Sequence, residues 1–474
     1  MAGLTKSSLI SCVLVALIVG APKAQTITLE EFTKQLTKSH PIFVEARLSP
    51  RIEEERRNAL AGAEDWSFRA STQYAHLEPA LSFSGPERTD AVAIRGGLQR
   101  AIWRTGGRLS VSYSATRANL KIDPLFGFPD SYYENILTLS YSHPLIRNRG
   151  GSLDRLDYDL QGFEIDLSDL RAREEVEGFL ASTMALFLDW SFLTEQRRIT
   201  QERLRLSEEE SSRTQKKRES NFVDQADVFR AQDAVRAWRQ SLLLVESLWR
   251  AAQAELAVLA QSQSISGYTP LFDLYQQLDS VSLDSATVEL LESSRPIRAL
   301  KISLNQLEES RRGFTETVRP DLSLVAEFNA KRVDAGFGRS LQMDKPDAII
   351  GLRFTVPLGN RAAHSRVSES DLLIARLRET LKNLELELIS SYTSLHIQIE
   401  ELRNVLKLNL EQMESAKKRT EEELKLYNQG RGELTFVIQS RDNEQNAELT
   451  RARNALNYHK LLLQRRALAD QLYQ

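Results

Sequence analysis

Several short stretches of the chain alternate apolar and polar residues with a period of two, which is typical of a β-strand with one apolar face. In residues 321–331, one face carries Leu322, Leu324, Ala326, Phe328 and Ala330, and the other is largely made of Asp321, Ser323, Glu327, Asn329 and Lys331. Residues 350–356 alternate Ile350, Leu352, Phe354 and Val356 with Gly351, Arg353 and Thr355. Residues 66–74 and 137–142 have the same character. We therefore predict one early and one late pair of strands.

The early pair is separated by further residues with the same pattern. Leu109, Val111 and Tyr113 alternate with Ser110, Ser112 and Ser114, and a turn signal, Thr105-Gly106-Gly107, precedes them. We predict that residues at about 90–120 form an added β-hairpin.

Long helices are predicted between the strands. Residues 151–217 contain no Pro and residues 361–428 contain neither Gly nor Pro, so a continuous helix would run about 100 Å in each case. Shorter helices are expected at 28–62, with possible breaks at Pro41 and Pro50, and at 225–261 and 432–473. Apolar residues spaced by three and four among many charges indicate antiparallel coiled coils, as in Leu395, Ile399, Leu402 and Leu406.

The same order of elements occurs twice. His40-Pro41-Ile42 recurs as Arg295-Pro296-Ile297, Pro144-Leu145 recurs as Pro357-Leu358, and residues 228–233 resemble residues 437–442. Because the three matches keep their order, we predict an internal duplication. Repeat one is expected at 25–261, including the added hairpin, a linker at 262–283, and repeat two at 284–474.

The first 24 residues have the features of a secretory signal peptide. Lys6 precedes an apolar stretch from Leu9 to Gly20, and a polar sequence begins at Gln25. We expect cleavage after Ala24, although Pro22 leaves the site open. Cys12, the only Cys, lies inside this stretch, and the apolar run continues beyond it, which argues against lipidation.

Composition excludes several classes of protein. The net charge of −3 argues against nucleic-acid binding, which needs a basic surplus. A single Cys excludes a disulfide scaffold. The predicted strands leave two classes open, a β-sandwich with one face in water and a transmembrane barrel. Few strands between such long helices disfavour a sandwich, and a barrel would need several chains to close.

Catalytic chemistry is not expected, and neither are a cofactor, a metal site or an enzyme activity. The motifs for nucleotide, zinc and nucleophilic sites are missing from the sequence, and its six His have no metal-binding spacing. The acidic triplets Glu208–Glu210 and Glu421–Glu423 lie beside basic clusters, 216–218 and 417–419, so we interpret them as solvated helix faces.

The chain resembles the TolC-like outer membrane efflux protein family over nearly its whole length. The resemblance rests on Thr28-Leu29-Glu30-Glu31 with Ser39-His40-Pro41, the two Pro-Leu junctions, and the turns at 218–228 and 427–437. It implies a mainly α fold with transmembrane β-strands: two tandem repeats of long antiparallel coiled-coil helices, and strands that close a β-barrel in a homotrimer. Four strands per chain would give a barrel of twelve strands in the trimer. The added hairpin leaves this number open.

The family also implies how the helices end. Their tips dock a periplasmic adaptor (membrane fusion) protein, and the corresponding residues here are Asn221, Phe222, Val223, Asp227, Gly430 and Arg431. Gly430 and Asn221 suit a left-handed turn. Asp224, Glu433 and Phe436 depart from the family pattern. Phe222 and Val223 could contact the adaptor or simply pack the tip.

The function implied by the resemblance is an outer membrane exit duct for efflux or type I secretion, fed by an adaptor and an inner-membrane pump and conducting passively. Residues predicted to line the lumen are Ser323, Glu327, Asn329, Lys331 and Arg353, and those predicted to face lipid are Leu322, Leu324, Phe328, Leu352 and Phe354. A soluble periplasmic coiled-coil scaffold is the alternative. Substrate, pump class and the residues of a gate constriction cannot be deduced from the sequence.

Overall fold

The computed structural model describes residues 25–78, 86–122, 129–277 and 283–473. The predicted signal peptide with Cys12, and residues 278–282 of the predicted linker, lie outside these ranges. The chain forms two compact units. The first combines Met1–His40, Ser182–Leu278 and Glu401–Lys460, and the second combines Pro41–Ala181, Asp279–Glu400 and Leu461–Gln474.

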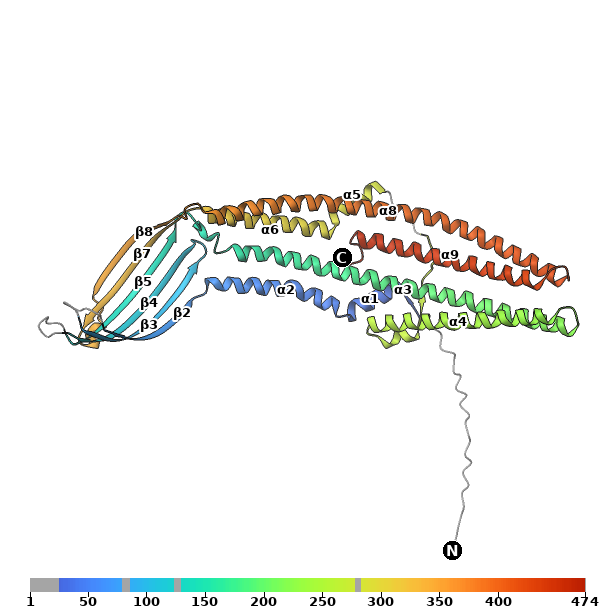
Figure 1. Cartoon of the computed structure of the whole chain (residues 1–474), viewed down its shortest axis with the longest axis horizontal. Coiled ribbons are helices and arrows are strands. Elements are labelled where there is room, and N and C mark those ends of the chain that lie inside the picture. The colour runs from blue at the N-terminus through green and yellow to red at the C-terminus, as the bar shows by residue number, and fades with distance from the viewer. Residues whose placement is uncertain (1–24, 79–85, 123–128, 278–282, 474) are drawn as a thin grey trace, which may run out of the picture. The chain divides into compact units, whose positions relative to one another are not determined.

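Six strands form one antiparallel sheet in the second unit (Figure 1). In spatial order they are β2 (Ser67–Leu77), β3 (Arg88–Ile102), β4 (Gly107–Lys121), β5 (Ser131–Pro144), β7 (Asp321–Asp334) and β8 (Lys345–Thr355). The predicted hairpin corresponds to β3 and β4, and the expected turn at Thr105-Gly106 joins them. The hairpin lies inside the sheet, between β2 and β5.

Helices make up most of the remaining chain, as predicted. The second unit contains α2 (Ile42–Ala61), α5 (Leu283–Ser293), α6 (Arg295–Val318) and the short α7 (Phe337–Ser340), and the first contains α1 (Leu29–Ser39) and α4 (Gln225–Leu259). The longest helices are α3 (Leu156–Glu219) and α8 (Arg361–Asn428), of 64 and 68 residues, and α9 (Leu434–Leu468) follows α8. Their lengths agree with the expected span of about 100 Å.

Some element boundaries differ from the predicted ones. The opening helix is divided into α1 and α2, because His40 precedes Pro41 and a residue before proline disfavours the helical conformation. A capping box begins α1: Glu31 N–H donates to Thr28 Oγ1 at 3.2 Å, and Thr28 N–H donates to Glu31 Oε2 at 3.0 Å. The last helix ends at Leu468 rather than at 473, because Asp470 has a φ of 56°.

The region predicted as a linker contains a strand. Strand β6 (Tyr268–Leu271) pairs in parallel with β1 (Gln25–Thr28). Within the same unit, Ser39 Oγ donates to the Ala260 carbonyl at 2.8 Å. The start of the described chain is therefore attached to the segment that follows α4.

Each unit has its own apolar core. In the first, the rings of Phe32 and Phe187 lie 5.4 Å apart, and Phe187 meets Trp190 edge-on at 5.7 Å. All three side chains are fully buried. In the second, a cluster of buried residues packs α5 and α6 against α8 and the end of the chain: Leu290, Ile297, Leu388, Tyr392 and Ala469.

A buried ion pair fixes the end of the chain in the second unit. Arg295 Nη1 lies 3.1 Å from Glu177 Oε2, and the Glu177 carboxylate also accepts the backbone N–H groups of Leu472 and Tyr473 at 2.8 Å each. Glu177 thereby links α3, α6 and the residues after α9. Burial raises the pKa of the neighbouring Asp470 carboxyl.

One described helix, within Arg149–Glu219, contains a stretch that is long and apolar enough to cross a membrane. Half of this stretch is buried inside the structure. Because Leu180, Phe187 and Trp190 of α3 belong to the buried core, packing accounts for its apolar character.

Two adjacent glycines lead from β5 into α3 with the same backbone conformation but different surroundings. Gly150 and Gly151 both have a φ of 71°. A Cβ atom at Gly150 would meet nothing within 4 Å, whereas at Gly151 it would lie 1.8 Å from the Trp103 carbonyl oxygen. The turn after β3 therefore packs directly on the Gly151 backbone.

We predict that Gly150→Ala lowers stability by about 1–2 kcal/mol, the usual cost of a left-handed non-glycine residue. Gly151→Ala should cost more, because the Trp103 backbone must also move. Urea unfolding of the purified protein followed by Trp fluorescence measures both variants. Equal losses would show that the close approach to Trp103 has no energetic consequence.

Candidate functional site

One face of the sheet is apolar and exposed. The registers place Leu322 opposite Phe354, Leu324 opposite Leu352, and Phe328 opposite Leu139, so these side chains share a face. Large apolar side chains on this face are 40–78% exposed: Phe68, Tyr74, Val92, Ile94, Leu98, Leu137, Leu139, Phe328, Ile350, Leu352 and Phe354. So large an apolar surface is typical of contact with a membrane or a partner.

The opposite face is lined by polar groups that bond to one another both across strands and within a strand. The Ser110 and Ser140 hydroxyls are 2.6 Å apart, Thr138 Oγ1 donates to Asn329 Oδ1 at 2.6 Å, and Asn329 Nδ2 donates to Glu327 Oε1 at 2.7 Å. Lys331 forms an ion pair with Asp347. Ser323 lies opposite Arg353 on the same face.

The structure thus groups the ten predicted barrel residues as two sets. The five residues predicted to line the lumen share the polar face, and the five predicted to meet lipid share the apolar face. Their contacts with water or lipid remain predictions. Ile349 and Val333 are exposed apolar residues on the polar face, so the separation is not complete.

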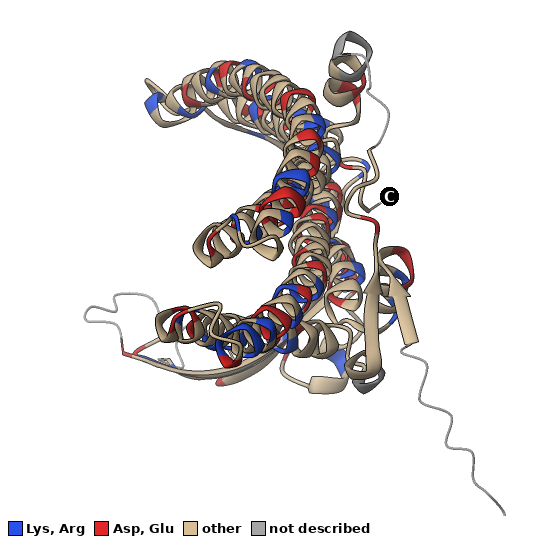
Figure 2. Cartoon of the chain, turned by 90° about the vertical axis from the view of Figure 1, so that its right-hand side faces the viewer, with Lys and Arg blue, Asp and Glu red and all other residues tan. Residues whose placement is uncertain are grey.

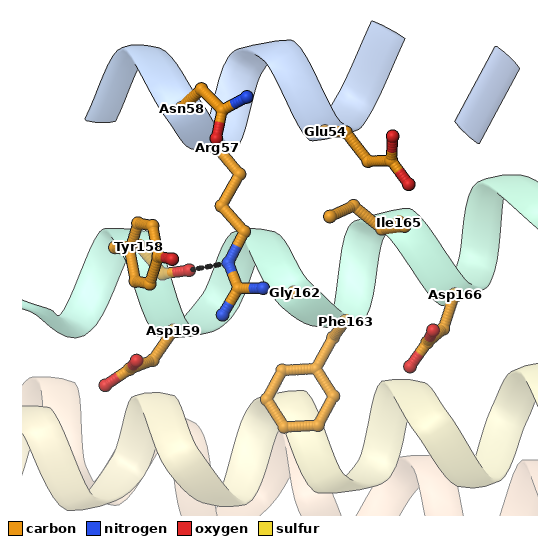
Figure 3. A pocket seen from close by; sticks show the side chains of 9 residues that line it. All are labelled: Glu54, Arg57, Asn58, Tyr158, Asp159, Gly162, Phe163, Ile165 and Asp166. Carbon is orange, nitrogen blue, oxygen red and sulfur yellow. Dashed lines mark hydrogen bonds between the residues drawn. The ribbon is translucent and has the colours of Figure 1, made fainter. Parts of the chain in front are cut away.

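A polar groove of about 630 Å³ lies between α2 and α3 in the second unit. Figure 3 shows Arg57 extending from α2 towards α3, where its Nε donates to the Tyr158 carbonyl at 3.2 Å and its guanidinium lies 4.2 Å from the Tyr158 ring centre. Glu54, Asp159 and Asp166 line the same groove. Helix packing accounts for these contacts.

Acidic and basic residues are interspersed along the helices (Figure 2). Many form pairs one turn apart, such as Arg173 with Asp169 at 2.9 Å. In the part of the chain that the structure describes, no three His, Cys, Asp or Glu side chains are grouped so as to bind a metal.

The two helical tips, both in the first unit, have the same backbone geometry. Asn221 after α3 and Gly430 after α8 have φ values of 55° and 76°, which confirms the expected left-handed turns. The next residue of each tip bonds back to the helix: Phe222 N–H to the Lys217 carbonyl at 2.9 Å, and Arg431 N–H to the Leu426 carbonyl at 3.0 Å. Both ends are Schellman motifs.

Two of the departures from the family pattern lie directly before helices, although the Asp224 side chain makes no capping hydrogen bond. Asp224 is the N-cap residue of α4, with an extended backbone (φ −84°, ψ 162°). Asp is favoured at an N-cap, and its charge suits the positive end of the helix. Glu433 occupies the corresponding position before α9.

A groove of about 880 Å³ lies between the tips, lined by the turns after α3 and α8 and the first turns of α4 and α9. Four of the six predicted docking residues line it: Phe222, Val223, Asp227 and Gly430. Asn221 and Arg431 do not. Phe222 is 79% exposed, and Val223 is half-buried. Adaptor contact by these residues remains a prediction.

Sequence reasoning missed two residues that join the tips. Lys217 Nζ donates to the Tyr427 carbonyl at 3.1 Å and lies 3.4 Å from the centre of the Tyr427 ring. Tyr427 is buried in a cluster with Ala231, Leu434 and Val437. Burial lowers the pKa of Lys217, with the charge of Arg213 adding to the shift. Lys217 and Tyr427 lie far apart in the sequence, so only a pairing of the two repeats could have revealed this contact.

The acidic triplet of α3 also needs a correction. Glu208 and Glu209 are half-exposed and pair with arginines, but Glu210 is buried. It lies 3.5 Å from the buried Arg203, whose Nη2 is 2.8 Å from Asp442 Oδ1 on α9. Burial raises the pKa of Glu210, against the lowering effect of Arg203 and Arg441. An ion network, Arg203–Glu210–Arg441–Asp442, in which Arg203 and Glu210 are buried, thus links α3 to α9.

We predict that Arg203→Met weakens the packing of α3 on α9 by about 3–5 kcal/mol, because the buried Glu210 carboxylate loses one of its two arginine neighbours and Asp442 loses its partner on α3. Arg205→Met is the matched control: Arg205 is half-exposed, and among the described residues its ion pairs are with Glu202 and Glu209 of its own helix, so the loss should stay below about 1 kcal/mol. Amide hydrogen exchange in α9 compares the two variants. Equal exchange rates would mean that the network does not stabilise this contact.

Comparison with known proteins rests on structure alone. No protein-family model matches the chain, and no curated protein matches it. Solved outer membrane channels do. VceC of Vibrio cholerae has a TM-score of 0.67 at 11% identity, over 94% of this chain and 96% of that one. CmeC of Campylobacter jejuni has a TM-score of 0.66 at 13% identity, over 100% and 94%.

A third similar structure is the MtrE outer membrane channel of Neisseria gonorrhoeae in its open state, with a TM-score of 0.65 at 12% identity over 94% of this chain and 89% of that one. At such identities the likeness establishes the fold. It extends over the sheet and both pairs of long helices, since nearly the whole chain is matched. The chain has the fold of TolC-like outer membrane channels.

Proposed function

We propose that the protein is an outer membrane channel that serves as the exit duct of a tripartite efflux or type I secretion system. Three copies close a barrel from their sheets, and the helices extend into the periplasm. Substrates pass through by passive conduction. The energy comes from an inner-membrane pump that a periplasmic adaptor connects to the tips.

The two-faced sheet is the observation that carries this proposal. Its exposed apolar face suits lipid, and its polar face suits a water-filled lumen. The chain also shares its fold with solved outer membrane channels.

The soluble periplasmic scaffold is less favoured. A scaffold in water would have to leave side chains such as Phe68, Ile350 and Leu352 more than two-thirds exposed. Single-particle electron microscopy of the detergent-extracted protein distinguishes the two functions. A threefold tube that depends on detergent is expected, and a thin rod that stays soluble without detergent would contradict the proposal.

Charge on the polar face should control ion selectivity. We predict that Glu327→Lys makes the channel more anion-selective, seen as a shift of the zero-current potential under a KCl gradient in planar bilayers, with little loss of assembly. Phe328→Leu, the neighbouring residue on the apolar face, is the control and should leave selectivity unchanged. Unaltered selectivity in a conducting Glu327→Lys channel would mean that the polar face does not line the lumen.

Adaptor docking should depend on the exposed side chain at the tip of α3. We predict that Phe222→Asp reduces efflux of a fluorescent dye by about tenfold or more in cells that carry the matching pump and adaptor, because a charge replaces an apolar contact worth about 1.5–3 kcal/mol. Conductance in bilayers should stay unchanged, which separates docking from folding. Full efflux by the variant would exclude Phe222 from the docking surface.

A further inference from the structure

The sheet of this chain ends in two strands without a neighbour on their outer side. Among the described residues, β2 pairs only with β3, and β8 pairs only with β7. Each has 11 residues, and neither edge is covered by another described strand. Open edges of this length bind other strands readily.

A membrane makes the pairing of these edges obligatory. Unpaired backbone N–H and C=O groups have no water partner in the hydrocarbon, so a sheet in a bilayer must close. At the usual strand spacing, β2 and β8 of one chain are about 24 Å apart, since four strands separate them. Six strands are also fewer than the eight of the smallest membrane barrels. The partner for each edge is therefore another copy of the chain.

Strand direction and side-chain pattern both permit this contact. All neighbours in the sheet are antiparallel, and the number of strands is even, so β8 runs opposite to β2. A β8 edge placed beside the β2 edge of the next copy continues the antiparallel order. Ser71 and Gln73 of β2 lie on the polar face, as do Gly351 and Arg353 of β8. Pairing of odd with odd residue numbers keeps both faces continuous.

The added hairpin, β3 and β4, is an integral part of the sheet that would form the barrel wall. Strands β3 and β4 have 15 residues each and pair with each other over their whole length. Val92, Ile94 and Leu98 continue the exposed apolar face, whereas Arg95 and Ser112 continue the polar face. Strand β2 reaches the rest of the sheet only through β3.

We propose that three copies form a barrel of 18 strands, with β8 of each copy paired to β2 of the next. This inference rests on the proposed channel function, from which the number of copies comes. The number of 18 strands, from six strands per chain, replaces the twelve that four strands per chain would give. Because barrel diameter grows about linearly with strand number, the pore through the outer membrane is about 1.5 times wider than a twelve-stranded one.

The absence of Cys from residues 25–474 makes disulfide cross-linking a direct test. Ser71→Cys on β2 is combined in turn with Asp347→Cys, Ile349→Cys, Gly351→Cys and Arg353→Cys on β8, a set that covers the neighbouring registers of one face. Facing residues on paired strands have the spacing that a disulfide needs. Ser71→Cys with Ile350→Cys, on the opposite face, is the matched control.

We expect at least one pair of the set to give cross-linked trimers on non-reducing gels of membranes, and the control pair to give none. A second variant, Gln73→Cys with Ala93→Cys, tests whether the hairpin stays in the wall, since these residues face each other on β2 and β3. This variant should also assemble as a trimer, and the disulfide should form within each chain. Density from electron microscopy should then resolve 18 strands.

Three results would overturn the proposal. The first is a conducting trimer in which no β2–β8 pair cross-links between copies. The second is a cross-link between Ser71→Cys and Ser140→Cys, which would place β2 beside β5 and exclude the hairpin. The third is a β2–β8 bond within one chain. Failure of the channel function itself gives a different result, a detergent-independent protein in which the Gln73–Ala93 pair alone forms its bond.

Discussion

Backbone hydrogen bonding at the two open edges of the sheet is the constraint on which the rest of the structure depends. Residues in β2 and β8 have one side paired and the other side free of described strands. Water could form hydrogen bonds with the unpaired backbone N–H and C=O groups of these strands, but lipid cannot. An apolar face as exposed as that around Ile350 and Leu352 favours lipid. In lipid, several copies must then assemble, because the backbone groups at the sheet edges of a single chain would have no hydrogen-bond partners.

The helical tips are held together by both apolar and polar contacts. Apolar packing around Tyr427 supplies a small core, and Lys217 and the Arg203 network supply polar contacts between helices. Buried ion pairs contribute geometry more than net stability, because desolvation offsets much of their attraction. Contacts of this kind favour one specific packing of the helices more than they raise its net stability.

Much of the fold could be predicted from the sequence because its signals are local. The alternation of apolar and polar residues predicted the strands around Phe328 and Leu352. Gly430 indicated a left-handed turn, which the structure confirms. Contacts between distant segments could not be predicted in the same way. Glu210 looks like its exposed neighbours in the sequence, but α9 brings Arg441 beside it and Asp442 beside Arg203. The parallel pairing of β1 with β6 likewise joins residues too far apart for periodicity to reveal.

The position of the added hairpin bears on how such a barrel can change during evolution. In the proposed barrel, an insertion of one strand would reverse the direction of every later strand, and α3 would then begin on the opposite side of the membrane. A hairpin adds two strands, so β5 still returns to the side from which β2 started, and the helices that follow are undisturbed. In the proposed barrel, pore width can therefore evolve in steps of one hairpin per chain, independently of the proposed docking of an adaptor at the other end of the helices.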